Sequence, residues 1–232
     1  MPASEDKSSC LMCKNKSTCF SKLNTPELEL TNEHRVEIKF RKGETIAKQG
    51  SFANNIFFIK SGLAKVYIEV DDSEKNLILN ILGSGNLIGL PSLYGNNVFN
   101  FSASAIEDTV ICSIEKSVVR NLVKQNGDFA SEIIRTMNEC SVQSYHRLVS
   151  LTQKQMNGRL ADALIYLAET VFQSNSFKMS LTRKDLAELT SMSTMSVVHI
   201  IKDFKDNGII RNEGGKVEIT DMGLLKRISK IG

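Results

Sequence analysis

The stretch that decides the fold reads LTRKDLAELTSMSTMSVVHIIKDFKDNGII and spans residues 181–210. Thr182 is a strong helix N-cap, and Asp185 at the third helical position is close to a capping box in its logic. These two residues predict a short helix over Asp185–Leu189. Residues 191–193 then form a three-residue break, and a second helix follows it.

The second helix begins after Ser193, which is again a good N-cap. Val197, Ile201 and Phe204 recur at the spacing of one buried helix face, and Gly208 ends the helix. Two short helices about a tight turn predict a helix-turn-helix, whose second helix can lie in the major groove of DNA. A structural pair of helices without a DNA target is the alternative.

A β-hairpin is predicted directly after this unit. The sequence IIRNEGGKVEIT, residues 209–220, has two short β-rich runs about Gly214 and Gly215. A hairpin in this position is a wing. The order of helix, turn, capped helix and hairpin favours DNA binding over a structural helix pair.

Two further helices are predicted before this unit. GRLADALIYLAETVFQ, residues 158–173, is amphipathic, and from about Asp128 to Gln155 the chain has no Gly or Pro. Apolar residues in this longer segment recur at spacings of three and four, which predicts a helix of about seven turns. We expect it to pair with its twin in a dimer, and packing on its own domain is the alternative. The predicted seam consists of Ile133, Met137, Cys140, Leu148 and Leu151.

Residues 35–115 have the pattern of short strands. The runs VEIKF, ETIAKQ, NIFFIKSG, LAKVYIEV, NLILNIL, NFSASAI and TVICSI are rich in β-branched and aromatic residues. Turn signals such as RKG, DDSE and GSGN separate them. Many short strands with Gly-rich turns predict a β-sandwich or barrel. The clearest hairpin joins LAKVYIEV to NLILNIL.

The composition is that of a globular protein. Hydrophobic residues make up 41% and charged residues 24% of the 232 residues, and no run approaches the roughly 18 apolar residues of a membrane span. The N-terminus lacks the apolar segment of a signal peptide, so we expect a cytoplasmic protein without a membrane partner. The net charge is +3, and from Gln153 onward 12 basic residues stand against 9 acidic ones. This balance allows nucleic-acid binding without establishing it.

No catalytic constellation is visible in the sequence. His34, His146 and His199 are scattered, and the chain lacks a G-x-x-x-x-G-K-[ST] phosphate-binding loop. We therefore do not expect an enzyme.

Three of the five cysteines lie within CLMCKNKSTC, residues 10–19, in the pattern C-x2-C-x5-C. Clustered cysteines of odd number in a cytoplasmic protein indicate metal or redox chemistry more than disulfides.

Three segments resemble the Crp/Fnr family of bacterial transcription regulators. They are KGETIAKQGSFANNIFFIKSGLAKVYIEV (42–70), GSGNLIGLPSLYG (83–95) and the helix-turn-helix of residues 181–210. The resemblance covers nearly the whole chain. It implies an α+β fold with an N-terminal cyclic-nucleotide-binding-like β-roll, a long dimerisation helix and a C-terminal winged helix-turn-helix.

The resemblance also implies partners and domains. The expected partners are a second copy in a homodimer, a pseudo-palindromic double-stranded DNA operator and RNA polymerase. The expected domains are a cysteine-containing arm at residues 1–26, the β-roll sensor at 27–125, the long helix at 126–155 and the DNA-binding domain at 156–232.

The cyclic-nucleotide branch of the family uses a Gly-Glu pair and an Arg-Ser/Thr pair around the ligand. Here the first pair reads Gly89-Leu90, and the second segment, NVFNFSASA at residues 97–105, has no Arg or Lys. A cyclic phosphate in the roll would lack a cationic partner. We therefore expect neither cAMP nor cGMP to bind.

The oxygen-sensing Fnr branch carries C-x2-C-x5-C at its N-terminus and takes a fourth cysteine from a roll strand. This chain matches with Cys10, Cys13 and Cys19, and with Cys112 in TVICSI. The resemblance implies that these four thiolates ligate a 4Fe–4S cluster. Zinc and no bound metal are the alternatives. The fifth thiol, Cys140 on the long helix, is expected to be a small core residue.

The recognition helix departs from the family, whose members usually present a Glu and an Arg to base edges. Met195 and His199 occupy the matching positions. Met195 is suited to a thymine methyl group and His199 to a guanine edge, or His199 is simply solvated. Thr194 and Ser196 can reach phosphates or bases. The candidate DNA-binding residues are Thr182, Arg183, Ser193, Thr194, Met195, Ser196, His199 and Lys202.

These observations predict a homodimeric, sequence-specific DNA-binding regulator. Its roll and cysteines are expected to sense a signal, which is oxygen or redox state if an iron–sulfur cluster is bound. Without a metal, the roll is expected to sense a small molecule or a partner protein. A sensory or scaffold module that acts only through protein partners is the second class of function, and the wing and the capped helix disfavour it.

Overall fold

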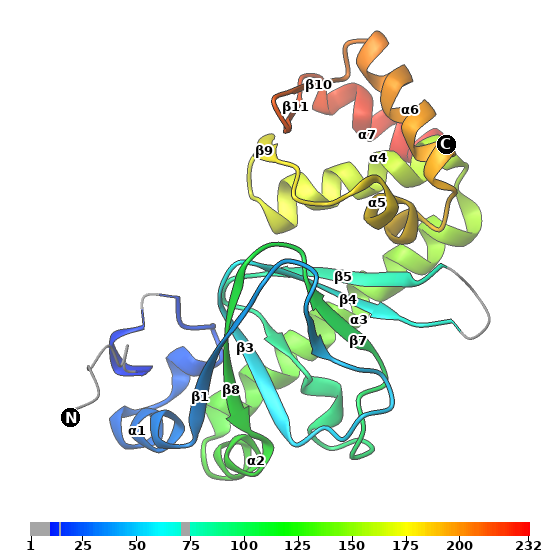
Figure 1. Ribbon diagram of the computed structural model, residues 1–232. Coiled ribbons are helices and arrows are strands. Elements are labelled where there is room, and N and C mark those ends of the chain that lie inside the picture. Colours follow the sequence, from blue (N-terminus) through cyan, green and yellow to red (C-terminus); the bar gives the residue numbers. More distant parts are fainter. Residues whose placement is uncertain (1–9, 14, 71–74) are drawn as a thin grey trace. The chain divides into compact units, whose positions relative to one another are not determined.

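The computed structural model describes residues 10–232, except residue 14 and residues 71–74. Contacts divide the chain into two units, whose elements are labelled in Figure 1. The first unit comprises residues 1–64 and 82–140, and the second comprises residues 65–81 and 141–232. The second unit thus includes a hairpin of the roll and the end of the long helix. The four-part division made from the sequence stays a prediction.

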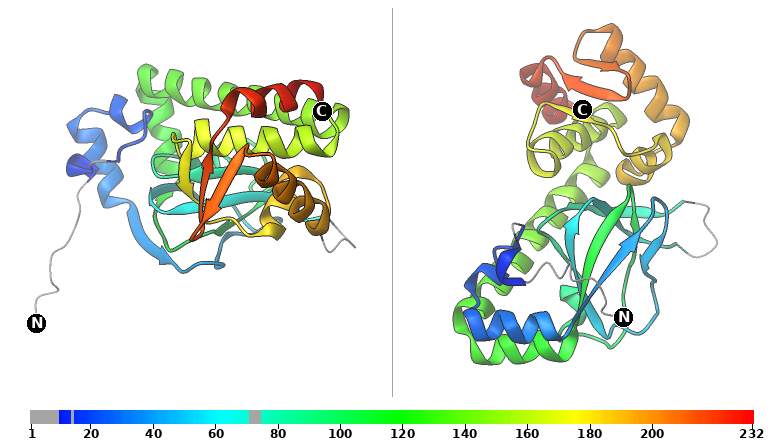
Figure 2. Two further views of the ribbon diagram at one scale, coloured as in Figure 1. Left: turned by 90° about the horizontal axis from the view of Figure 1, so that it is seen from above. Right: turned by 60° about the vertical axis from the view of Figure 1, so that its left-hand side comes forward.

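The first unit opens with a helix that the strand pattern did not predict. Two 3-10 turns, η1 (Cys10–Met12) and η2 (Phe20–Lys22), precede helix α1 (Thr25–Glu33). Asn24 and Glu27 cap α1 reciprocally, because each side chain accepts the backbone N–H of the other, at 3.0 and 2.8 Å. Figure 2 shows α1 beside helix α2 (Lys116–Gln125).

The roll strands form two four-stranded sheets. One has the order β1-β8-β3-β6, with β1 (Arg35–Phe40), β3 (Asn55–Ser61), β6 (Leu87–Ile88) and β8 (Thr109–Glu115). The other has the order β2-β7-β4-β5, with β2 (Thr45–Ala47), β4 (Leu63–Ile68), β5 (Leu77–Gly83) and β7 (Ser102–Ala105). All seven predicted strand runs are confirmed. Strand β6 and the turn η3 that follows it (Leu90–Ser92) were not predicted.

Helix α3 (Gly127–Gln153) is the predicted long helix, and its first turns belong to the core of the first unit. Phe129 and Ile133, four residues apart, are 0% and 3% exposed and pack in that core. Ile133 is therefore not part of an exposed seam, which corrects the prediction. Cys140 is exposed rather than a core residue, and Leu151 is half-buried. The exposed large apolar side chains of α3 are Ile134, Met137, Val142, Tyr145, Leu148 and Val149.

The second unit contains the predicted winged helix-turn-helix. Helix α4 (Met156–Tyr166) runs into a π-helical turn, η4 (Leu167–Val171). Helices α5 (Arg183–Thr190) and α6 (Thr194–Asp206) are followed by the wing strands β10 (Ile210–Glu213) and β11 (Lys216–Ile219). Two elements were not predicted: strand β9 (Ser176–Lys178), which completes a sheet of order β10-β11-β9, and helix α7 (Met222–Ile231).

The hairpin of residues 65–81 contacts the helices of the second unit through polar groups. Lys65 Nζ lies 2.6 Å from Asp185 Oδ1 and 3.5 Å from Glu188 Oε2, both on α5. The Tyr166 hydroxyl accepts a hydrogen bond from the Ile81 N–H at 3.1 Å and donates one to the Ile81 carbonyl at 3.0 Å.

Across the described residues, no helix combines the length and apolarity that a bilayer crossing requires.

Candidate functional site

Helix α5 is fixed by the predicted capping box. Thr182 Oγ1 accepts a hydrogen bond from the Asp185 N–H at 3.0 Å, and Asp185 Oδ2 accepts one from the Thr182 N–H at 2.8 Å. The helix ends at Thr190, and the C-cap residue Ser191 has a left-handed φ of +52°. A non-glycine residue rarely adopts this conformation, and here it produces the tight turn into α6 that the sequence predicted.

Helix α6 has one buried face and one exposed face. Ser193 Oγ accepts a hydrogen bond from the Ser196 N–H at 3.0 Å, which confirms the predicted N-cap. The buried residues are Val197, Ile200, Ile201 and Phe204. Because this face holds the helix on its own unit, the residues between them are projected outward.

The exposed face carries predicted DNA-binding residues and one exposed apolar residue to which the sequence assigned no role. Met195 is 77% exposed, and the side chain of His199 is 76% exposed. Val198 is 43% exposed and was not predicted, although its spacing of three from Met195 could have indicated it. The Ser196 hydroxyl lies 2.8 Å from that of Ser193, so it contributes to the cap. Of the remaining candidates, Thr182, Thr194 and Lys202 are exposed and Arg183 is half-buried.

A pocket in the first unit gathers three of the four predicted thiols. It is lined by Cys10, Cys13 and Cys112, by the cationic side chains of Lys16, Arg35 and Lys60, and by Phe20, Leu28, Thr31, Phe58 and Ile114. Its internal volume is about 30 Å³. Thiols from the N-terminal arm and from β8 therefore meet in a small space with apolar walls and nearby positive charge.

A polar link holds the arm against the roll at this pocket. Asn32 Oδ1 accepts hydrogen bonds from the Cys10 N–H and from Arg35 Nε, each at 3.1 Å. Arg35 Nη1 in turn donates to Cys112 Sγ at 3.5 Å. The Arg35 side chain is only 9% exposed. Asn32 and Arg35 thus connect Cys10 of the arm to Cys112 of β8 at the wall of the pocket.

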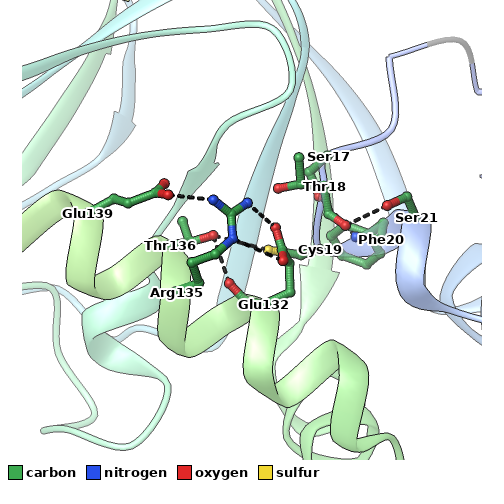
Figure 3. A network of polar contacts seen from close by, with 9 residues as sticks. All are labelled: Ser17, Thr18, Cys19, Phe20, Ser21, Glu132, Arg135, Thr136 and Glu139. Atoms are coloured by element: carbon green, nitrogen blue, oxygen red, sulfur yellow. Dashed lines mark hydrogen bonds and ion pairs between the residues drawn. The ribbon is translucent and has the colours of Figure 1, made fainter.

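Cys19 lies in the same hydrophobic core but faces helix α3 instead of the pocket. It is 1% exposed, and its Sγ lies 3.5 Å from Thr136 Oγ1. Figure 3 shows Cys19 beside Thr136, next to the ion pairs of Arg135 with Glu132 and Glu139. Within the described part of the chain, no three His, Cys, Asp or Glu side chains form a group that could hold a metal ion as they stand.

The protonation of these groups follows from their surroundings. Burial raises the pKa of the Cys10, Cys19 and Cys112 thiols, and the charge of Arg35 opposes this rise at Cys10 and Cys112. The thiols are therefore neutral at pH 7, and a metal must displace their protons. Hydrogen bonds from Arg135 and Thr18 lower the pKa of Glu132 to about 2.

Gly89 and Leu90, which stand where the cyclic-nucleotide branch has its Gly-Glu pair, are surrounded by apolar side chains. Gly89 has a φ of +104°, and a Cβ at this residue would lie 3.4 Å from Ile56 Cδ1 and from Phe99 Cε1. Leu90, in place of the Glu, is 5% exposed. The expectation that neither cAMP nor cGMP binds stays a prediction.

Two family profiles match the chain on the two parts just described. The profile described as cyclic nucleotide-binding domain matches residues 37–126, and the one described as Crp-like helix-turn-helix domain matches residues 158–228. Together they cover more than half of the chain. The chain belongs to the Crp/Fnr family of transcription regulators. Members of the Crp/Fnr family bind DNA, typically act as dimers and are not enzymes, so this chain is a DNA-binding regulator with the predicted α+β architecture.

Individual Crp/Fnr relatives span most of the chain at low identity. The CRP-like cAMP-activated global transcriptional regulator of Mycobacterium tuberculosis is 25% identical over 82% of this chain and 86% of its own length. Electron transport regulator A of Shewanella oneidensis is 24% identical over 91% of this chain and 86% of its own length. The structure of FixK2 from Bradyrhizobium japonicum matches with a TM-score of 0.77 and 16% identity, over 84% of this chain and 96% of the other. At that identity the structural likeness shows the fold alone.

Proposed function

We propose that this Crp/Fnr regulator is a cytoplasmic homodimer that acts on a pseudo-palindromic operator, with RNA polymerase as a partner. We further propose that its arm and Cys112 sense oxygen or redox state through an iron–sulfur cluster. The observation that carries the sensing proposal is the pocket, where Cys10 and Cys13 of the arm meet Cys112 of β8. Clustered cysteines in a cytoplasmic protein are more often metal-binding or catalytic than disulfide-forming.

The residues of the pocket suit such a cluster in their chemistry. A 4Fe–4S cluster takes four cysteine thiolates, and three of the candidates already line the pocket. Lys16, Arg35 and Lys60 offset part of the negative charge of the thiolates. Cys19 must leave Thr136 to become the fourth ligand. When bound, the cluster supplies an oxygen-labile link between the arm and the roll.

The arm is placed to affect the long helix. Thr18 hydrogen-bonds with Glu132, and Cys19 contacts Thr136, so two consecutive arm residues touch consecutive turns of α3. Met137, an exposed apolar residue of the proposed seam, directly follows Thr136. Any change that pulls Cys19 from α3 therefore alters contacts beside the seam. Loss or gain of the cluster could therefore change how the α3 helices of the two subunits pack together.

The dimer itself is proposed to form along the exposed apolar side chains of α3. Ile134 replaces Ile133 of the predicted seam, and Met137, Cys140, Leu148 and Leu151 remain proposed members of it. Ile134, Met137 and Leu148 are 59%, 39% and 62% exposed. A long helix that leaves such side chains in water gains free energy when a second copy covers them.

The test of the sensing proposal is iron and sulfide analysis after strictly anaerobic purification. Wild type should contain about four irons and four sulfides per subunit, and the Cys→Ser variants at positions 10, 13, 19 and 112 should lose them. Cys140→Ser is the matched control and should keep full iron, because Cys140 lies on the exposed part of α3. Iron-free wild type, or full iron in Cys112→Ser, contradicts the proposal.

A metal-free thiol sensor is the second candidate. The contact of Cys19 with Thr136 favours it, because it leaves three thiols in the pocket where a cluster needs four. The same panel separates the two candidates. A metal-free sensor predicts wild type without iron or sulfide whose DNA affinity still changes on reaction with a thiol oxidant, and a Cys112→Ser variant that no longer responds.

A further inference from the structure

Two apolar side chains stand on the outer face of the recognition helix. Met195 is 77% exposed and Val198 is 43% exposed, while Val197 and Ile201 of the same helix are buried. Residues three apart share a helix face, so Met195 and Val198 form one small apolar surface. A large apolar side chain left in water is costly unless a partner covers it.

The polar groups around this surface are few. Residues 194–200 contain no Arg, Lys, Asn, Gln, Asp or Glu, which make the bidentate or charged contacts to base edges, so their polar side chains are Thr194, Ser196 and His199. The Ser196 hydroxyl is engaged with Ser193 at 2.8 Å. His199 Nε2 lies 3.7 Å from Asp203 Oδ2 on the next turn. The first two turns of α6 therefore offer mainly apolar contact to a base edge.

The apolar feature that a base pair presents in the major groove is the C5-methyl group of thymine. Met195 and Val198 are separated by about 4.5 Å along the helix axis, which is close to the roughly 3.4 Å between successive base pairs. We infer that Met195 and Val198 read the 5-methyl groups of thymines at neighbouring base pairs, so that each half-site is rich in A·T pairs. The inference rests on the family's DNA binding and not on the proposed cluster.

The experiment first selects bound duplexes from random DNA, once under anaerobic conditions and once in air. Each thymine of the selected half-site is then replaced by uracil, which keeps the hydrogen-bonding edge and lacks only the methyl group. Wild type should bind about fourfold more weakly for each methyl that it contacts, the factor that corresponds to about 0.8 kcal/mol for one buried carbon group. Uracil in the flanking sequence should have no effect.

Variants assign each methyl group to a side chain. Met195→Ala should abolish the effect of uracil at one position, and Val198→Ala should abolish it at the neighbouring one. Both residues are exposed and alanine favours helices, so the fold should be kept, which circular dichroism checks. Lys202→Ala is the control: it should weaken all sequences similarly and leave the sensitivity to uracil intact.

Three results of the selection and the uracil replacements overturn the inference. They are selected half-sites without thymine, wild-type binding that tolerates uracil at every position, and an equal effect of uracil in wild type and in both alanine variants. Failure to select any DNA overturns it as well. Because iron and oxygen sensitivity are measured separately, a chain without iron that still distinguishes thymine from uracil contradicts the proposed cluster and supports this inference.

Discussion

Replacing Lys65 by Met should destabilise helix α5 at neutral pH. Lys65 Nζ lies 2.6 Å from Asp185 and 3.5 Å from Glu188, and the three side chains are 19%, 11% and 3% exposed. Asp185 keeps its hydrogen bonds with Thr182 in the variant. Among the described residues, the cation that remains beside Glu188 is Lys184, at 3.9 Å, whose side chain is 67% exposed. The variant therefore leaves a buried carboxylate almost without a partner.

The expected loss is about 2 kcal/mol. Removing one partner of a fully buried ion pair costs roughly 3–5 kcal/mol. The cost is lower here because Lys65 is partly exposed and Asp185 retains other hydrogen bonds. A local loss of about 2 kcal/mol corresponds to about 30-fold faster hydrogen exchange of the α5 amides, if they exchange through local opening.

The effect has a defined pH dependence. Burial disfavours the charge on Lys65, but its bonds with Asp185 and Glu188 outweigh burial and raise its pKa. Burial likewise opposes the charge on Asp185, and the bonds from Lys65 and Thr182 nevertheless lower its pKa. The network therefore contributes stability above the unfolded pKa of Asp, and this contribution is lost as the pH falls through the lowered pKa of Asp185. The difference between wild type and variant should shrink from pH 7 toward acid.

Hydrogen exchange with peptide resolution measures this effect at pH 7 and at lower pH, after correction for the intrinsic exchange rate. Lys60→Met is the matched control, because Lys60 pairs with Glu37 at 2.7 Å where the two side chains are 26% and 32% exposed. It should cost less than about 1 kcal/mol. Unchanged exchange of α5 in Lys65→Met, or a loss that stays constant as the pH falls, would refute the reasoning.

Met137→Glu should convert the proposed dimer to monomer in sedimentation, because it brings two carboxylates together near the dimer axis. Gln143→Glu is the control, because helical spacing places Gln143 on the side of α3 opposite Ile134; an unchanged dimer in Met137→Glu removes α3 as the seam. Phe129→Ala should lower the free energy of unfolding in urea by about 3–5 kcal/mol, since Phe129 is 0% exposed; a loss below about 1 kcal/mol argues against the core described. Arg135 and Thr18 lower the pKa of Glu132 to about 2, whereas the pKa of Glu in the unfolded chain is about 4.3. The ionised Glu132 therefore stabilises the folded protein at pH values above about 4.3, and this contribution is lost as the pH falls toward 2. Glu132→Gln should therefore remove part of the acid dependence, and identical acid profiles of variant and wild type speak against this ion pair.

Local chemistry made the helix-turn-helix predictable. The box of Thr182 and Asp185 and the cap at Ser193 depend on residues three apart, so the sequence contains all the information needed. The unpredicted strand β9 differs in this respect. It has three residues, and it exists because Phe177 pairs with Val217 far along the chain. Such pairing is invisible to a periodicity argument.

The candidate sites were predictable in residue type but not in orientation. Helical spacing places Ile133 and Ile134 on adjacent faces of α3, and only the packing of Ile133 with the roll core decides that Ile134 is exposed. The cysteine pattern gave the four candidate ligands. It does not contain the fact that Cys19 faces Thr136 while Cys10 and Cys13 face Cys112, because this depends on how the arm folds against α3.

One measurement of DNA affinity tests the central claim that the cysteine pocket controls DNA binding. The affinity of anaerobically purified wild type for its selected operator is measured before and after exposure to air, while the visible absorbance is followed. We expect the affinity to change at least tenfold, equivalent to about 1.4 kcal/mol of coupling, in step with the loss of absorbance, and Cys112→Ser to show neither change. An affinity that is identical before and after air, in wild type that contains iron and sulfide, would contradict the account.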